Sequence, residues 1–410
     1  MAKAVAQKSQ LRSRRVFVGL AAGAGLSAIL PGCSGPVRGP AVPLDKTARA
    51  KVLGLPNERF LPLLGPGPLE AEFMGAVERS GRARLLAENK PAPEMNLLAI
   101  SGGGENGAFG AGLLNGWTIQ GSRPVFDLVT GVSTGALSAP FAFLGPKYDA
   151  QLKAVYTELS PSQILEKRSV LRAALFDDAM TDNAPLFQTI TRYLNDEMLA
   201  EIGKSYDDGR LLLIGTTDLD AQVPVIWNIG AIAKSGHPKA PDTIRRILLA
   251  SAAIPGAFPP TMFDVMLDGQ QYQELHVDGG AFAQAFLYPA SITAQRRARL
   301  AKRLPTLSIS AYVIRNGRLD PEWATVERRT MGIAGRAIST MIASSGYNDV
   351  VRIYNTSLRD EVRFNLAYIG KDFTTVLPEP FDPGFMRALY DYGYQRAIKG
   401  YDWSKQPPAA

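Results

Sequence analysis

The sequence contains one cysteine, Cys33, and two histidines, His237 and His276, among its 410 residues. A single cysteine excludes a disulfide within the chain and any Cys-x-x-Cys metal or redox motif. Two histidines leave little room for a metal site built from several imidazole groups. We therefore expect no metal ion and no organic cofactor.

Long apolar runs are also scarce. The longest uncharged apolar stretch covers residues 16–35, so a polytopic membrane protein is excluded. Hydrophobic residues make up 46% of the chain and charged residues 20%, which is the profile of a folded globular protein. The length allows two or three domains, or one large α/β domain.

Acidic residues are absent from residues 1–32, which hold five lysines and arginines. The rest of the chain therefore carries only +2 of the net charge of +7. Because the rest of the chain is nearly neutral, it shows no excess of positive charge for binding the phosphate backbone of a nucleic acid. We expect no nucleic-acid partner, and the sequence identifies no protein partner.

The N-terminal segment has the layout of an export signal. A basic stretch ending in Arg14 and Arg15 precedes a short apolar core and then small residues. The paired arginines resemble a bacterial twin-arginine signal, and residues 30–33 resemble a lipobox, in which the cysteine is lipidated and becomes the mature N-terminus. An uncleaved anchor or a chance apolar tail is the alternative.

This resemblance implies a location in the bacterial cell envelope. Residues 1–32 would be the export signal of a lipoprotein, and a lipid on Cys33 would hold the exported protein at the membrane on the periplasmic side. In lipoproteins, Ser34 rather than aspartate after the cysteine favours release to the outer membrane.

Three further segments follow the signal. Nine prolines in residues 34–94 break long helices and central strands, so residues 33–94 are predicted to be a proline-rich tether and an irregular arm with one helix over 69–88. Apolar runs and glycine turns mark a compact catalytic domain over residues 95–315. Residues 316–410 are predicted to be a C-terminal α/β extension packed on the core.

A first glycine-rich turn carries candidate chemistry. Residues 96–100 predict a strand and residues 108–120 a helix, and the loop between them contains Gly102, Gly103, Gly104 and Gly107. Such a loop points backbone N–H groups at an anion near the helix N-terminus. The glycines also fit a dinucleotide-binding pattern, but Asp127 lies at the start of the next strand, whereas a ribose-binding acid is needed at the end.

A second turn follows the strand predicted over residues 125–130. It has the sequence Gly131-Val132-Ser133-Thr134-Gly135 and precedes a helix of small residues over 136–144. A G-x-S-x-G between strand and helix is typical of a nucleophile elbow. Ser133 is thus the candidate nucleophile, with N–H groups of the first loop as donors to an oxyanion. A merely structural turn is the alternative.

The serine needs a base, and Asp278 and His276 stand together near a predicted strand end. Gly279 and Gly280 follow Asp278 and free the backbone beside its carboxylate. A sheltered carboxylate acts as a general base if its pKa approaches the working pH.

Other polar residues are predicted to have structural roles. His237 fits an exposed turn, and Asp218 and Asp220 fit turn and capping roles better than metal-binding or triad roles.

Together these motifs resemble the patatin-like phospholipases, a family of lipid acyl hydrolases. The match comprises the glycine loop at 102–107, the elbow at 131–135 and D-G-G at 278–280, with a similar block at 250–260. The resemblance implies an α/β fold, a three-layer sandwich with a central, mostly parallel sheet flanked by helices. Two positions depart from the family, because Ser101 replaces the usual aspartate and Asn106 the usual arginine or lysine.

The resemblance also implies roles for individual residues. Ser133 and Asp278 would form a catalytic dyad without a histidine. The oxyanion hole would be formed by Gly102, Gly103 and Gly104. The remaining motif glycines would be Gly107, Gly131, Gly135, Gly279 and Gly280.

Three functions compete. In the leading one, a serine lipid acyl hydrolase cleaves carboxylic esters of (phospho)lipids through an acyl-enzyme on Ser133. The second is an esterase with a Ser–His–acid triad, with His276 as base and Asp218 or Asp220 as acid. The third is a non-catalytic envelope lipoprotein on the same fold. The expected partners are a lipid or ester substrate and a membrane surface reached through the lipidated N-terminus.

Overall fold

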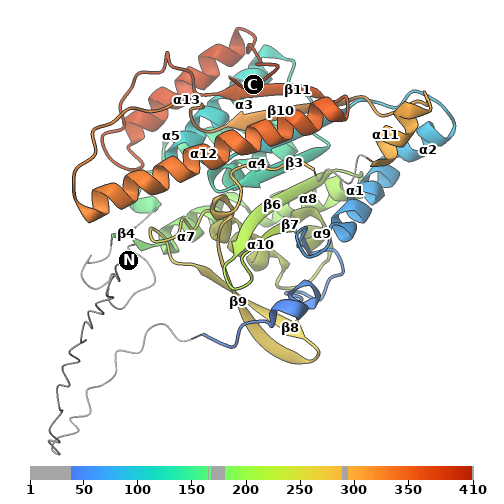
Figure 1. Cartoon of the computed structure of the whole chain (residues 1–410), viewed down its shortest axis with the longest axis horizontal. Coiled ribbons are helices and arrows are strands. Elements are labelled where there is room, and N and C mark those ends of the chain that lie inside the picture. The colour runs from blue at the N-terminus through green and yellow to red at the C-terminus, as the bar shows by residue number, and fades with distance from the viewer. Residues whose placement is uncertain (1–37, 165, 168–180, 289–293, 409–410) are drawn as a thin grey trace, which may run out of the picture. The chain divides into compact units, whose positions relative to one another are not determined.

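The computed structural model describes residues 38–164, 166–167, 181–288 and 294–408 (Figure 1). The predicted export signal and Cys33 lie outside the described residues. Residues 36–410 form one compact unit. Within the described ranges, none of the helices combines the length and the apolar character needed to span a bilayer.

A mixed β-sheet lies at the centre of this unit. Its parallel part consists, in spatial order, of β11 (Arg363–Tyr368), β10 (Ile309–Arg315), β2 (Met95–Ile100), β3 (Leu128–Val132) and β6 (Leu211–Asp218). These strands are buried on both faces, which explains why their sequences are apolar runs and do not alternate between apolar and polar residues.

Antiparallel strands complete the sheet on the β6 side. β7 (Val223–Asn228) returns antiparallel along β6, and β1 (Arg59–Phe60) pairs with β7. β9 (Gln270–Asp278) pairs with the end of β6 and with β8 (Thr261–Leu267). A separate two-stranded sheet is formed by β4 (Glu166–Lys167) and β5 (Thr181–Asp182).

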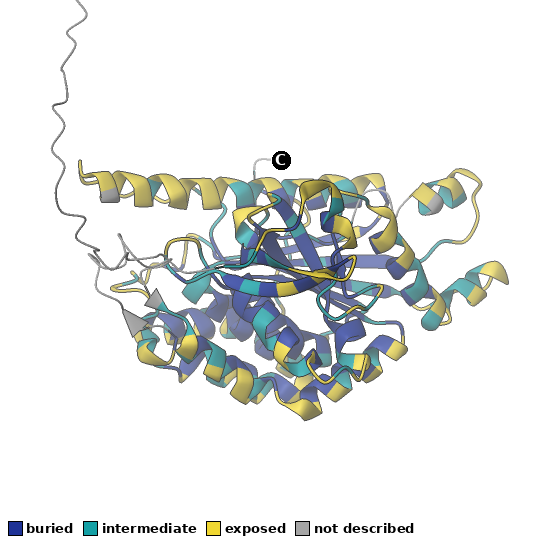
Figure 2. Ribbon diagram, turned by 90° about the horizontal axis from the view of Figure 1, so that it is seen from below, coloured by how far each residue is buried: buried dark blue, intermediate teal, exposed yellow. Residues whose placement is uncertain are grey.

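Helices cover both faces of the sheet, and the buried residues lie between the layers (Figures 1 and 2). One face packs against α3 (Gly107–Gln120), α4 (Thr134–Leu144), α5 (Asp149–Thr157), α8 (Asp196–Asp207), α10 (Ala240–Ser251) and α13 (Pro383–Ile398). The opposite face packs against α1 (Gly67–Arg79) and α12 (Thr330–Arg359). The predicted three-layer α/β sandwich with a mostly parallel sheet is confirmed.

Shorter helices complete the unit. They are α2 (Arg82–Ala87), α7 (Ala184–Tyr193), α9 (Ile229–Lys234), α11 (Ala294–Ala301) and the 3-10 turns Leu44–Arg49, Gly104–Asn106, Pro146–Tyr148, Pro161–Gln163 and Gly279–Ala281.

A helix predicted as continuous is divided in two, and an N-cap separates two further helices. The helix expected over 69–88 is interrupted at Gly81, whose φ of +74° is a left-handed conformation that ends α1. α7 and α8 are separate helices, because Asn195 starts α8 by accepting a hydrogen bond from the Met198 N–H at 2.9 Å.

Residues 38–94 are packed on the body, which corrects the prediction of a tether there. β1 pairs with β7, and the Arg59 side chain is buried against Glu274, far away in sequence. The prolines break the segment into short pieces, but those pieces still dock.

Residues 316–410 also belong to the same unit. β11 extends the central sheet beside β10, and α13 packs closely along α3. A Cβ on Gly116 would lie 2.5 Å from the carbonyl oxygen of Tyr394, so the close helix packing requires glycine there. The segments before and after residue 315 therefore share one sheet.

Candidate active site

Strand pairing brings Ser133 and Asp278 together. β3 pairs with β6 as far as Val132 opposite Gly215, and β9 pairs with the next residue of β6, so that Asp278 lies opposite Thr216. Because β3 and β9 end at neighbouring positions along β6, the residue after β3 meets the last residue of β9. The Ser133 side chain thus lies beside the Asp278 carboxylate, close enough to lower the pKa of that carboxyl.

Ser133 occupies a strained turn between β3 and α4. Its φ of 55° and ψ of −128° lie in a region that residues with a side chain seldom adopt. The flanking glycines are sterically required. A Cβ on Gly131 would lie 2.6 Å from the carbonyl oxygen of Gly135, and one on Gly135 would overlap the carbonyl oxygen of Ile100. The strain is thus held by the close packing of β2, β3 and α4.

Ser251, at the end of α10, holds this turn from behind. Its Oγ accepts a hydrogen bond from the Ser133 N–H at 3.0 Å and donates one to the Gly215 carbonyl at 2.7 Å. Sequence reasoning placed Ser251 only within the block at 250–260 and gave it no role.

Asp278 is a buried carboxylate, only 4% exposed. Burial raises its pKa to about 7, although hydrogen bonds from Ser133 and from the Gly280 N–H, the latter at 2.7 Å, oppose the shift. A Cβ on Gly279 would lie 2.5 Å from the carbonyl oxygen of Gly215, so this glycine lets Asp278 approach β6. A carboxyl group with a pKa near neutrality has the proton affinity that a general base needs.

The glycine loop supplies two free N–H groups beside the serine. The Gly103 and Gly104 N–H groups donate to no acceptor in the described part of the chain. Gly102 differs from the prediction, because its N–H already donates to the Gln284 carbonyl at 3.1 Å. Its contribution is steric, since a Cβ on Gly102 would lie 3.2 Å from the Ser133 Cβ.

A buried guanidinium supports this loop from below. Arg315 Nη1 donates to the Gly102 carbonyl at 3.0 Å and to Ser101 Oγ at 3.1 Å. Burial lowers the pKa of Arg315 to about 10, which keeps it charged at neutral pH. The Gly102 carbonyl and the Gly103 N–H belong to one peptide group, so a cation on the oxygen polarises the N–H. The sequence departure at Asn106 had left a cationic group at this loop unaccounted for.

An apolar cavity opens beside Ser133. It encloses about 830 Å³ including its mouth, and no lysine or arginine is among its lining residues. The half-buried carboxyl group of Glu105 also lines it, and burial raises the pKa of this group. Large apolar side chains from α4, α7 and the loops around them form the walls, including Leu137, Phe141, Leu186, Ile190, Phe258 and Phe381.

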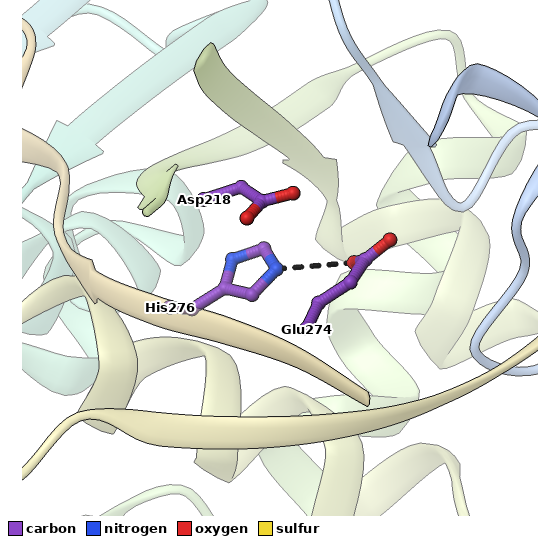
Figure 3. A group of neighbouring side chains, drawn as sticks. All are labelled: Asp218, Glu274 and His276. Carbon is purple, nitrogen blue, oxygen red and sulfur yellow. Dashed lines mark hydrogen bonds and ion pairs between the residues drawn. The ribbon is translucent and has the colours of Figure 1, made fainter. Parts of the chain in front are cut away.

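His276, the other candidate base, is engaged elsewhere (Figure 3). It is fully buried, its Nδ1 lies 2.9 Å from Thr216 Oγ1, and its Nε2 lies 3.2 Å from Glu274 Oε2. With both ring nitrogens bonded, His276 has no nitrogen free to accept the proton of Ser133. The geometry contradicts the triad in which His276 is the base.

Donor atoms of Asp218, Glu274 and His276 lie within 4.8 Å of one another (Figure 3), and these residue types ligate metals. Both Glu274 oxygens, however, accept from the Arg59 guanidinium. Burial disfavours the charge on Glu274, yet Arg59 and His276 lower its pKa to about 2. The contacts are those of a buried ion-pair network, which uses the atoms that a metal ion would need.

The remaining candidates have structural roles, although Asp220 is engaged in an ion pair and not in a turn or cap. Asp218 Oδ1 accepts from the Asp220 N–H at 2.9 Å in the turn after β6. Asp220 forms two hydrogen bonds with Arg38 at 2.7 Å. His237 is partly buried in the turn before α10, where its Nδ1 accepts from the Lys239 N–H.

Comparison with known proteins identifies part of the chain. Residues 98–290 match the family model described as patatin-like phospholipase. Among solved structures, VipD from Legionella pneumophila is similar at 13% sequence identity and a TM-score of 0.36, with 76% of this chain and 67% of that chain covered. The search of curated proteins found no match.

Proposed function

We propose that the chain, a lipid ester hydrolase whose residues 98–290 match the patatin-like phospholipase family model, works through a dyad of Ser133 and Asp278. The observation that carries the proposal is that strand pairing places a serine on a strained elbow beside a buried carboxylate whose pKa is about 7.

The arrangement supports a two-step reaction. Ser133 Oγ attacks the ester carbonyl while Asp278 takes its proton, and the Gly103 and Gly104 N–H groups stabilise the oxyanion. Collapse of the tetrahedral intermediate breaks the ester C–O bond, and Asp278 returns the proton to the leaving alcohol. Water, activated by the same carboxylate, then releases the fatty acid from Ser133.

The cavity beside Ser133 supports a fatty acyl chain as the acid part of the substrate. Its lining is almost wholly apolar, so it favours a hydrocarbon chain that leaves water on binding.

For the location, we propose the cell envelope, with a lipid on Cys33. This proposal rests on the sequence alone, and Cys33→Ala tests it by fractionation. The exported variant should leave the membrane fraction, and a parent protein that is soluble with an unmodified Cys33 would contradict it.

Labelling with a fluorophosphonate, followed by peptide mapping, tests the chemistry. Label is expected on Ser133, with none on Ser133→Ala. Hydrolysis of aryl esters of increasing acyl length should favour longer chains, because each added CH₂ enters the apolar cavity. Asp278→Asn should lose activity by a factor on the order of 10⁴ or more, whereas His276→Ala, the matched control on the same strand, should keep it if folded. Label on another serine, or an active Asp278→Asn, would overturn the dyad.

A further inference from the structure

The first half of α12 projects from the body. The helix is 30 residues long, or about 45 Å at 1.5 Å per residue, about twice the length of a strand in the sheet. Val350 and Ile353, in its second half, are buried against β10 and β11. Residues 332–344 are exposed at every position except Arg336, which is intermediate, as the yellow end of this helix shows (Figure 2).

The projecting half extends beyond the edge of the sheet at which β2, β3 and β10 end (Figure 1). β10 runs parallel to β2 and β3, so it ends at the same edge as Ser133. α12 begins beyond that edge and runs back to the start of β11. It meets the body at Gly346, where a Cβ would lie 2.6 Å from Cζ of Arg315, the residue that supports the oxyanion loop.

The exposed half of α12 carries an apolar face. Ile333, Ile338 and Met341 are 54%, 55% and 70% exposed. At 100° per residue they fall, together with Ala337, within an arc of about 140°. In the loop before the helix, the Trp323 side chain is 89% exposed.

The charge of this region is positive. No aspartate or glutamate occurs from residue 328 to 348. The acids of the preceding loop are paired, namely Asp320 with Lys371, Glu322 with Arg318 and Glu327 with Arg329. Arg328 and Arg336 form no ion pair within the described ranges, so two positive charges remain uncompensated beside the apolar face.

We infer that residues 330–345 of α12, together with Trp323, dock the enzyme on an anionic lipid bilayer. An apolar helix face bordered by arginines, with a tryptophan beside it, matches the interface of acyl chains and phosphate groups. The inference rests on the proposed function, because a lipid substrate explains why this surface lies at the active-site edge. A helix face about 24 Å by about 10 Å is far smaller than the roughly 800 Å² per partner of a stable dimer.

The test compares two double variants in the full chain carrying Cys33→Ala, so that the N-terminal segment is common to all samples. Ile338→Asp with Met341→Asp places two charges on the apolar face. Ile119→Asp with Val125→Asp, at residues that are 68% and 71% exposed near the opposite edge of the sheet, is the matched control. Sedimentation with vesicles of phosphatidylcholine and phosphatidylglycerol measures binding, and a soluble butyrate ester measures the chemistry.

The α12 variant should bind these vesicles and hydrolyse their lipid at least tenfold less well than the parent, with an unchanged rate on the soluble ester. The control should match the parent in all three assays. Equal vesicle binding by the parent and the α12 variant would overturn the inference, as would a parent dimer that the α12 substitutions convert to a monomer without changing vesicle binding. A parent that binds vesicles through α12 but cleaves no ester would instead contradict the proposed function.

Discussion

The ionisation of Asp278 sets the pH at which the proposed dyad works. Burial raises the pKa of this carboxyl from 3.8 to about 7, and only the ionised form can accept the proton of Ser133. The kcat/KM for a short-chain ester should therefore rise with pH, from about a tenth of its maximum at pH 6 to about nine-tenths at pH 8.

The same pKa shift affects stability with the opposite sign. Between about pH 4 and pH 7 the folded protein keeps a proton on Asp278 that the unfolded chain releases, so stability falls as the pH rises through this window. A shift from 3.8 to about 7 corresponds to about 4 kcal/mol at 1.36 kcal/mol per pH unit. Asp278→Asn cannot ionise, and its side chain still accepts the Gly280 N–H. Relative to the parent it should gain about 4 kcal/mol between pH 4 and pH 8, while losing catalysis.

Denaturant unfolding at pH 4.5, 6 and 8 measures the stability, and the pH profile of ester hydrolysis measures the activity. Ser133→Ala is the control, because it removes one hydrogen bond that lowers the pKa of Asp278 but keeps the carboxyl group. Its stability should fall over a window displaced to higher pH. An activity midpoint near pH 4, or a stability difference between the parent and Asp278→Asn that is the same at all three pH values, would refute the reasoning.

Three further substitutions test the surroundings of the dyad. Ser251→Ala removes the acceptor for the Ser133 N–H and should lower kcat about tenfold with little change in KM, as steady-state kinetics would report. Arg315→Met removes the charge behind the Gly103 N–H and should slow both kcat and fluorophosphonate labelling about tenfold, with partial recovery in Arg315→Lys. Arg59→Met leaves the buried Glu274 carboxylate without its guanidinium partner and should cost about 3–5 kcal/mol in denaturant unfolding, most of it recovered when Glu274→Gln is added.

The sequence was sufficient for the layers and for the candidate dyad, because both depend on local patterns. Runs of apolar residues predict strands buried on both faces, and a glycine turn between strand and helix predicts an elbow whatever surrounds it. Gly131 is such a residue, since a Cβ there would lie 2.6 Å from the carbonyl oxygen of Gly135, four residues further along the chain. Steric requirements of this kind leave a direct trace in the sequence.

Contacts between distant residues leave no such trace. The density of prolines correctly predicted short elements in residues 38–94, but it carries no information on docking. Docking of this segment depends on the ion pair between Arg59 and Glu274, 215 positions further along the chain, and on the pairing of β1 with β7. For the same reason the sequence could not exclude His276 as the catalytic base. Its hydrogen bonds with Thr216 and Glu274 follow from the register between β6 and β9.

The oxyanion loop shows how register decides function. The sequence has Asn106 where the family that it resembles has an arginine or lysine. This departure predicted an oxyanion loop without a guanidinium group. In the parallel pairing of β10 with β2, Ile314 lies beside Ile100, so the next residues, Arg315 and Ser101, also meet. The guanidinium thus reaches the Gly102 carbonyl from a residue 213 positions further along the chain. The oxyanion loop needs a cation close to its peptide group. A residue on a neighbouring parallel strand can supply that cation just as a residue of the loop can.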